Sequence, residues 1–466
     1  MRKLIFILLL FLFSGYCAAG SEVVIRGVFP GGEGREVRLM TYEDLVSNRA
    51  SELDASRIGE DAFFEFRFEP DAPRLLFLRV MRSNHYFFVE PGGRYAANFV
   101  DLPSLPAIGP AARQFELKLS SQVTGPYELN ELIFRLEQMV AGYLESNVAG
   151  RVRTSHQRSL EAFRLEAEEA FREVEHPFFR DHLDYYFASL QRSLNTARFH
   201  TLFEKYIEPR PIAYQHPMAM DFMGSMFGKY LLGGASPTGL DELRRAINRY
   251  GSHRVVMDLL AADSLLANER LRELVMLMGV KGMLSEREFD KMQLLGLLEE
   301  TAVVSPVAEH RLIARNLVSG YRQMRPGFPP PALTLPDQQG RMLDLEDFSG
   351  SYVYLFFWDG DCPVSQADIA PMQALAAMAT DSLQLLGVLT GDRPPSSGPL
   401  SDPSGLGFPL LYAGDDHRLL DSFRLRSTPQ YILIGPDGNV LFYPFASPSG
   451  GAALQLPGLT GRGDDR

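Results

Sequence analysis

The sequence is poor in cysteine, in clustered positive charge and in long apolar runs, and each shortage excludes a class of function. Its formal net charge is -12, and its few lysines are scattered along the chain. Because phosphate binding needs a clustered positive surface, we expect no nucleic-acid partner. None of the nine histidines stands at a metal-ligand spacing such as HExxH. We therefore expect no metal and no other cofactor.

The N-terminus has the three-part layout of a secretory signal. Two basic residues, Arg2 and Lys3, precede the apolar run LIFILLLFLF, and small residues follow it. The run is too short to span a bilayer comfortably, and no later segment approaches the roughly 18 apolar residues that a membrane helix needs. We expect residues 1–20 to be a signal peptide. The protein should then work in the periplasm or the cell envelope.

Cys17 leaves two interpretations open. Cleavage after Ala19 or Gly20 removes it with the signal, so that Cys362 is the only thiol of the mature chain and no intramolecular disulfide can form. The alternative is a lipid-modified Cys17, since a cysteine just after an apolar stretch is where lipoproteins are anchored. Such an anchor would be the only attachment to a membrane that we expect.

The sequence pattern predicts a multidomain protein, and its first part is rich in strands. Within residues 21–105, short segments such as REVRLMTY, AFFEFRF and RLLFLRVM alternate apolar and polar residues or run apolar. Turn sequences such as PGGEG and EPGG separate them. Several short strands at this spacing predict a small β-sandwich-like module. No catalytic cluster stands out there, so we interpret the module as structural.

The period of the pattern then changes to that of helices, over residues 106–324. In YELNELIFRLEQMVAGYL, for example, Leu129, Leu132, Ile133 and Leu136 fall on one helical face. Similar faces recur, which predicts an all-helical segment of about eight to ten helices of ordinary length. The Met-rich and aromatic stretches here are more typical of packed core than of a ligand groove.

A proline-rich linker, residues 325–340, ends the helical pattern, because proline cannot continue a helix. Strand and helix signals alternate over residues 341–450, including a helix from about Pro363 to Ala379, and we expect residues 451–466 to form a flexible tail. This alternation predicts an α/β domain, a sheet covered by helices.

The α/β part carries a family resemblance. PPPALTLPDQQGRMLDLEDFSGSYVYLFFW, then a cysteine four residues after Trp358, then RSTPQYILIGPDGNV, together resemble extracytoplasmic thioredoxin-like proteins of the TlpA/ResA type over residues 327–445. The resemblance implies a thioredoxin-like fold with a cis peptide at Thr428–Pro429 beside the active-site helix. It also implies that Trp358, Ser365, Thr428 and Pro429 belong to the substrate-binding face.

In that family the turn between strand and helix carries Cys-x-x-Cys, in which the first thiol attacks a disulfide and the second resolves the mixed disulfide. Cys362 aligns with the attacking cysteine, and Ser365 stands in the place of the resolving one. Because a hydroxyl cannot accept the sulfur exchange, the dithiol cycle is excluded. Phe356 also occupies the place where some thioredoxins have a buried acid, and Asp359 and Asp361 flank the turn.

Three hypotheses follow for function. In the first, Cys362 forms mixed disulfides with exported proteins or small thiols, and an external thiol releases them. In the second, the domain binds exported proteins or peptides without thiol chemistry. In the third, the chain is a structural envelope protein whose binding site lies in the helical segment. A peroxidase function is disfavoured, because Asp359 stands where peroxiredoxins have a threonine.

Overall fold

The computed structural model describes residues 22–80, 83–101, 115–122, 127–147, 153–233, 236–360, 362–379, 382–391, 405–414, 416–425 and 427–460. The predicted signal peptide with Cys17, Asp361 and residues 461–466 of the predicted tail lie outside this part of the chain. No helix within the described ranges is both long and apolar enough to cross a membrane.

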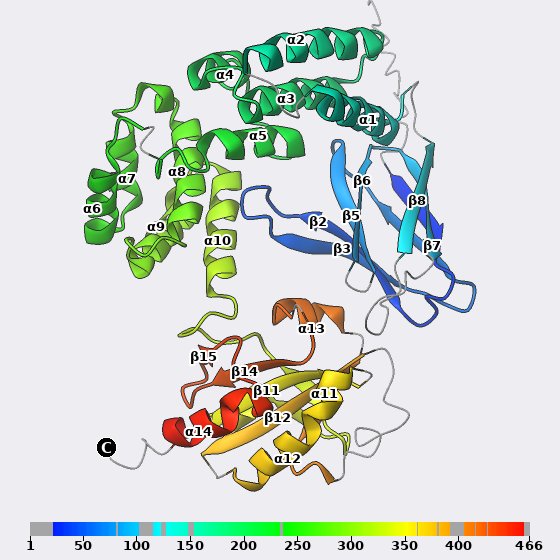
Figure 1. The fold of residues 1–466 in the computed structure, drawn as a ribbon, viewed down its shortest axis with the longest axis vertical. Helices are drawn as coiled ribbons and strands as arrows, with labels where there is room; N and C mark the ends of the chain where they lie inside the picture. The colour runs from blue at the N-terminus through cyan, green and yellow to red at the C-terminus, as the bar shows by residue number, and fades with distance from the viewer. Residues whose placement is uncertain are drawn as a thin grey trace, which may run out of the picture. The chain divides into compact units, whose positions relative to one another are not determined.

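The chain divides into two compact units (Figure 1). The first contains the described residues in 22–41, 52–101 and 115–184, and the second contains 42–51 and those from 185 onwards. The division falls inside the segment 106–324, which the sequence pattern indicates as one helical domain. Because the two compact units do not coincide with the predicted segments, the domain boundaries given by the sequence pattern remain predictions.

The first unit is built on two four-stranded sheets. One sheet has the strand order β4-β1-β7-β8 and the other β3-β2-β5-β6. Apolar side chains at alternate positions of both sheets form one shared core, as expected for strands with one buried face. The strands are β1 (Val23–Val28), β2 (Glu36–Tyr42), β3 (Ala50–Arg57), β4 (Phe63–Phe68), β5 (Arg74–Val80), β6 (Ser83–Val89), β7 (Arg94–Asp101) and β8 (Phe115–Gln122).

Helices α1 (Leu129–Asn147) and α2 (Arg153–Ala170) belong to the same unit, and α3 (Pro177–Ser193) spans the point of division. The Asn130 side chain binds the backbone of Phe88 in β6: it accepts from the amide at 2.7 Å and donates to the carbonyl at 2.9 Å. Tyr143 and Phe163 stack with ring centroids 4.6 Å apart. A polar anchor and apolar contacts thus join α1 to the sheet and to α2.

The helices of the second unit that precede its C-terminal sheet share one large apolar core. They are α4 (Phe199–Tyr206), α5 (Pro217–Phe227), α6 (Leu240–Tyr250), α7 (His253–Leu260), α8 (Glu269–Met283), α9 (Lys291–Val304) and α10 (Ala308–Arg322). The loop 42–51 packs into the same core through Val46. Its Val46 carbonyl accepts from Lys281 Nζ at 2.6 Å, and Asp44 accepts from the Asn316 amide at 2.8 Å.

The C-terminal part of the second unit contains a five-stranded sheet of order β13-β12-β11-β14-β15. β11, β12 and β13 are parallel, whereas β14 and β15 are antiparallel to their neighbours. The strands here are β9 (Thr334–Pro336), β10 (Met342–Asp344), β11 (Tyr352–Asp359), β12 (Leu383–Thr390), β13 (Leu410–Gly414), β14 (Gln430–Ile434) and β15 (Val440–Phe442). The helices are α11 (Pro363–Ala367), α12 (Ile369–Ala377), α13 (His417–Ser422) and α14 (Ala453–Thr460).

The central strand β11 is apolar along its length because both of its faces are buried. Its even-numbered residues, such as Phe356, pack with α12 and α14 in one core. Its odd-numbered residues, such as Phe357, pack with Leu420 of α13 in the core on the other face. Helices therefore cover the sheet on both sides (Figure 1), and the strand's C-terminal end delivers Asp359 and the following turn to the sheet edge.

The proline-rich segment joins this sheet through its backbone. The Gly327 amide donates to the Val440 carbonyl at 2.8 Å, and the Val440 amide donates to Phe328 at 2.9 Å. Gly327 has a φ of 87°, a left-handed conformation that favours glycine. The segment after α10 is therefore tied to β15.

Candidate functional site

Strand β11 and helix α11 hold Cys362 at the C-terminal edge of the sheet. β11 ends at Asp359, and Cys362 is the N-cap residue of α11, with Pro363 at the first helical position. Proline fits there because that position needs no N–H donor within the helix. The Cys362 amide donates to the Asp359 carbonyl at 3.1 Å and closes the turn. The sequence thus presents the thiol directly between strand and helix.

The sulfur of Cys362 faces the Thr428–Pro429 peptide. Its Sγ donates to the Thr428 carbonyl oxygen at 3.7 Å, across 66 residues of sequence. The peptide bond between Thr428 and Pro429 is cis, which confirms that prediction. The Cys362 side chain is partly exposed, and the neighbouring Val364 is 58% exposed. Cys362 is therefore partly open to solvent and has an exposed apolar side chain beside it.

Ser365 is fully buried beneath this turn. Its Oγ accepts a hydrogen bond from the Asp359 amide at 3.3 Å. The prediction that Ser365 contacts substrate is therefore wrong, because the side chain does not face the surface. Its hydroxyl instead accepts from a backbone amide at the end of β11.

Trp358 is also fully buried. Its ring packs against Phe356 at 4.6 Å and Phe408 at 6.0 Å between centroids, within the core under α12. The family resemblance places this side chain on the substrate-binding face, and its burial corrects that prediction. As an even-numbered residue of β11 it points into a covered face of the sheet, so it supports the turn from below.

A buried carboxylate, Asp368, lies between α11 and α12. The sequence predicts one helix over 363–379, but the structure has two helices that meet at this residue. Tyr431 and Ser449 both donate to Asp368, the serine at 2.8 Å. Burial, and then the hydrogen bond to Asp368, raise the pKa of Tyr431 above its ordinary value. The tyrosine therefore stays protonated as a donor.

Comparisons with known proteins find matches to the C-terminal domain. Residues 326–443 match the model of the AhpC/TSA family. The thiol-disulfide oxidoreductase ResA of Bacillus subtilis (strain 168) is 23% identical over 130 residues, which cover 28% of this chain and 72% of ResA. The C-terminal domain is a TlpA/ResA-like thioredoxin domain.

Solved structures of similar domains are known. The thioredoxin domain of a thiol-disulfide oxidoreductase from Bacteroides vulgatus has 20% sequence identity and a TM-score of 0.26, over 28% of this chain and 97% of that one. A thiol:disulfide interchange protein from Bacteroides sp. has 22% identity and a TM-score of 0.26, over 29% of this chain and 90% of that one.

In this thioredoxin-like domain, the site that the structure assembles is smaller than the predicted one. Cys362, Thr428 and Pro429 lie together, whereas Trp358 and Ser365 lie underneath them. Asp359 is half-buried at the end of β11. Asp368 is not among the predicted site residues, since one carboxylate within a predicted helix gives no sign of burial. Asp368 stands four residues before Met372 and next to Ile369, and both of these are buried. This helical spacing is the one signal in the sequence that could have predicted a buried Asp368.

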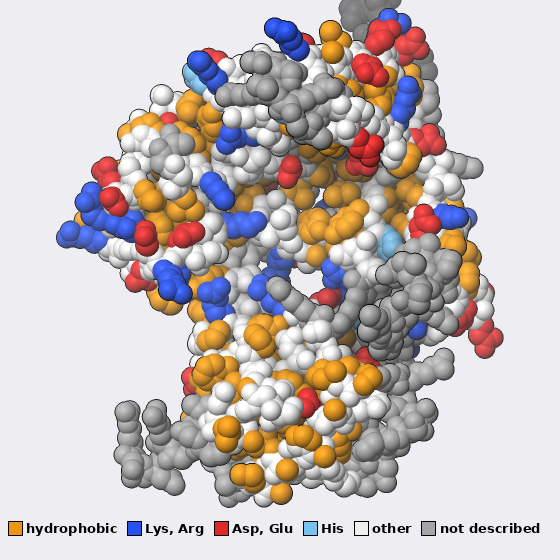
Figure 2. All heavy atoms as spheres, viewed as in Figure 1, with side chains coloured by type: hydrophobic (Ala, Val, Ile, Leu, Met, Phe, Trp, Pro, Cys, Tyr) orange, Lys and Arg blue, Asp and Glu red, His pale blue; other side chains and the backbone are white. Residues whose placement is uncertain are grey.

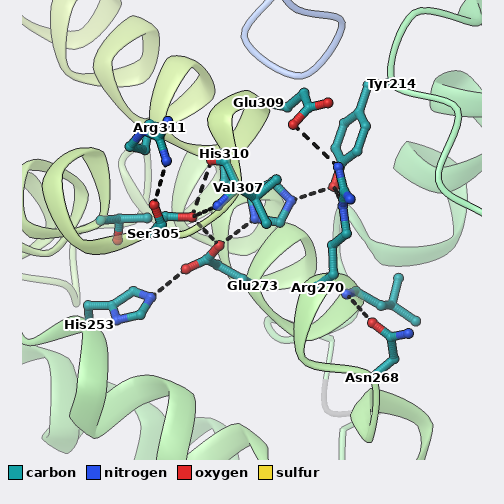
Figure 3. A network of polar contacts seen from close by, with 12 residues as sticks. Tyr214, His253, Asn268, Arg270, Glu273, Ser305, Val307, Glu309, His310 and Arg311 are labelled. Atoms are coloured by element: carbon teal, nitrogen blue, oxygen red, sulfur yellow. Dashed lines mark hydrogen bonds and ion pairs between the residues drawn. The ribbon is translucent and has the colours of Figure 1, made fainter.

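A second polar cluster lies in the helical part of the same unit (Figure 3). Glu273 of α8, which is buried, accepts from His253 Nε2 at 2.6 Å, from Ser305 Oγ at 2.6 Å and from His310 Nδ1. Burial alone would raise the pKa of Glu273, but the hydrogen bonds from His253, His310 and Ser305 outweigh it and lower the pKa to about 2. Glu273 is therefore an ionised acceptor at neutral pH.

This cluster connects three helices. His253 begins α7 and His310 lies in α10, so Glu273 bridges both to α8. The other ring nitrogen of His310 lies 2.6 Å from the Tyr214 hydroxyl, which also accepts from Arg270 Nε at 3.1 Å. Because every buried polar atom named here has a partner, we interpret the cluster as a structural network that fixes the helices.

Proposed function

We propose that this protein is an exported thioredoxin-like protein of the cell envelope, whose Cys362 forms mixed disulfides with exported proteins or small thiols. The observation that carries the proposal is the position of the thiol: partly exposed, at the start of α11, with its sulfur against the Thr428 carbonyl. The N-terminal sequence, with basic residues ahead of an apolar run, supports export.

The chemistry available to this site is one exchange step. The Cys362 thiolate attacks one sulfur of a partner disulfide, an S–S bond forms between them, and the second partner sulfur leaves as a thiolate. Cys362 is the one cysteine in the part of the chain that the structure describes. An external thiol must then attack the mixed disulfide, form a new disulfide with the partner sulfur, and return Cys362 to the thiolate.

The second candidate is a binding domain without thiol chemistry. The exposed side chain of Val364 and the Thr428–Pro429 peptide border Cys362, and an extended peptide could lie across them by backbone pairing. Under this proposal Cys362 contributes shape rather than reactivity.

One experiment separates the two. The wild-type chain is expressed with its signal, isolated from the envelope under non-reducing conditions, and compared with Cys362→Ala. The redox function predicts partners that DTT releases and that are absent from the Cys362→Ala sample. Ser365→Ala serves as the matched control, since it changes the same turn but keeps the sulfur. Partner sets that are identical in all three samples would exclude the redox function and favour binding.

A further inference from the structure

A cavity of about 510 Å³ lies along α10 and the proline-rich segment that follows it, inside the second unit. Three arginines line it: Arg49 from the loop 42–51, and Arg315 and Arg322 from α10. Pro329, Pro330 and Pro331 form part of the wall. Figure 2 shows Lys and Arg side chains gathered over the C-terminal part of α10.

The positive charge in this cavity is only partly balanced. Arg322 pairs with Glu299 at 2.6 Å, and Arg49 lies 3.6 Å from Glu43. Glu299 is the one acidic residue among the lining residues. Arg315 has no hydrogen bond or ion pair with any residue that the structure describes. The cavity therefore keeps one guanidinium without a counter-charge.

A donor of Arg322 is also unused. Its Nε is buried and has no hydrogen-bond partner among the described residues, although its Nη2 binds Glu299. A buried donor without an acceptor destabilises the folded chain, because it has lost its hydrogen bond to water. An oxyanion in the cavity would supply the missing acceptor and the missing negative charge together.

The chemistry of the lining residues limits the class of ligand that fits the cavity. A guanidinium presents its N–H groups as a planar fork that matches carboxylate and phosphate oxygens. The prolines in the wall have no N–H group to donate and present an apolar surface. The chain as a whole carries a net charge of -12, which disfavours large polyanions at long range. A small molecule with an apolar body and a compact anionic group fits these walls.

We propose that this cavity binds the carboxylate or phosphate group of a small organic anion, with Arg315 and Arg322 as its main ligands and Arg49 at its margin. The site does not include Cys362 and does not depend on the proposed thiol chemistry. Because α10 leads directly into the segment that pairs with β15, the ligand would contact both the helical part and the entry to the thioredoxin-like domain.

The test is calorimetric titration of the full chain, at low salt, with two probes: inorganic pyrophosphate for phosphate and citrate for carboxylate. The variants are Arg315→Gln and Arg322→Gln. Arg254→Gln is the control, since Arg254 lies on α7 with its side chain 87% exposed and does not line this cavity. We expect saturable binding by the wild type and by Arg254→Gln, weakened by added salt.

The expected loss in Arg315→Gln and Arg322→Gln is about tenfold or more, the size of one charge-assisted hydrogen bond. Binding of one probe alone identifies which group the site takes, and binding of both supports a general oxyanion site. The proposal is overturned when neither probe binds saturably, or when Arg315→Gln binds as tightly as the wild type. Arg315 has no described partner to lose, so unfolding does not obscure its result. Thermal unfolding of each variant without ligand checks this directly.

Discussion

Replacing Glu273 by Gln should destabilise the helical part of the second unit strongly at neutral pH. The pKa of Glu273 is about 2 against an ordinary 4.5. At about 1.36 kcal/mol for each pKa unit, this depression corresponds to roughly 3 kcal/mol of stability at pH 7. The physical cause is the set of hydrogen bonds from His253, His310 and Ser305, of which a neutral amide keeps only part.

The lowered pKa of Glu273 also predicts how the stability difference between wild type and Glu273→Gln changes with pH. A carboxylate whose pKa is lowered by folding stabilises the native state above its unfolded pKa, and this stabilisation is lost as the pH falls through the folded pKa. Wild type and Glu273→Gln should therefore differ above pH 4.5, converge as the pH falls, and become similar near pH 2. Urea unfolding followed by circular dichroism, repeated at several pH values, measures the difference.

The control is Glu204→Gln. Glu204 also pairs with a histidine, His200 at 3.6 Å, but both side chains are more than half exposed. Removing such a surface pair should change stability by about 0.5 kcal/mol or less. Equal urea midpoints for wild type and Glu273→Gln at neutral pH would refute the reasoning. So would a difference that persists unchanged in strong acid.

Three further predictions concern the thioredoxin-like domain. Ser365→Cys supplies the second sulfur, so complexes trapped on Cys362 should disappear and a disulfide should appear by mass spectrometry. Complexes that persist would contradict the alignment of Ser365 with the resolving cysteine. Asp368→Asn replaces one acceptor oxygen by an N–H donor, so the hydroxyl of buried Tyr431 or of Ser449 loses its match, which should cost about 1–3 kcal/mol in urea unfolding, whereas no loss would contradict the burial of Asp368. The single tryptophan, Trp358, should emit as a buried indole and shift to the red on unfolding; solvent-like emission from the native protein would contradict its place in the core.

The sequence was sufficient to predict the C-terminal sheet and the position of Cys362 between a strand and a helix. Both follow from the order of strand and helix signals along the chain. β11 is a continuous apolar run as far as Trp358, and such a run is typical of a strand covered on both faces. The approach of Cys362 to Thr428 followed from the family resemblance. Trp358 was misplaced since an apolar run does not reveal which of its residues face a particular core.

The polar networks could not be predicted for a different reason. Asp368 owes its role to Tyr431, 63 residues away, and Glu273 owes its role to His253 and His310, at separations of 20 and 37 residues. A carboxylate within an amphipathic helix is typical of a solvated face, so its local pattern indicates exposure. Only the tertiary contacts show that it is buried and paired.

Ser365 shows how a thioredoxin-like turn can be kept without its second sulfur. Its hydroxyl satisfies the Asp359 amide at the end of β11, and an oxygen accepts such a bond better than a thiol does. The contact between Cys362 and the Thr428 carbonyl does not involve Ser365, so the attacking half of the site is independent of the resolving half. Under the proposed function, the replacement therefore removes resolution without removing attack, and the lifetime of each mixed disulfide is set by thiols from outside the chain.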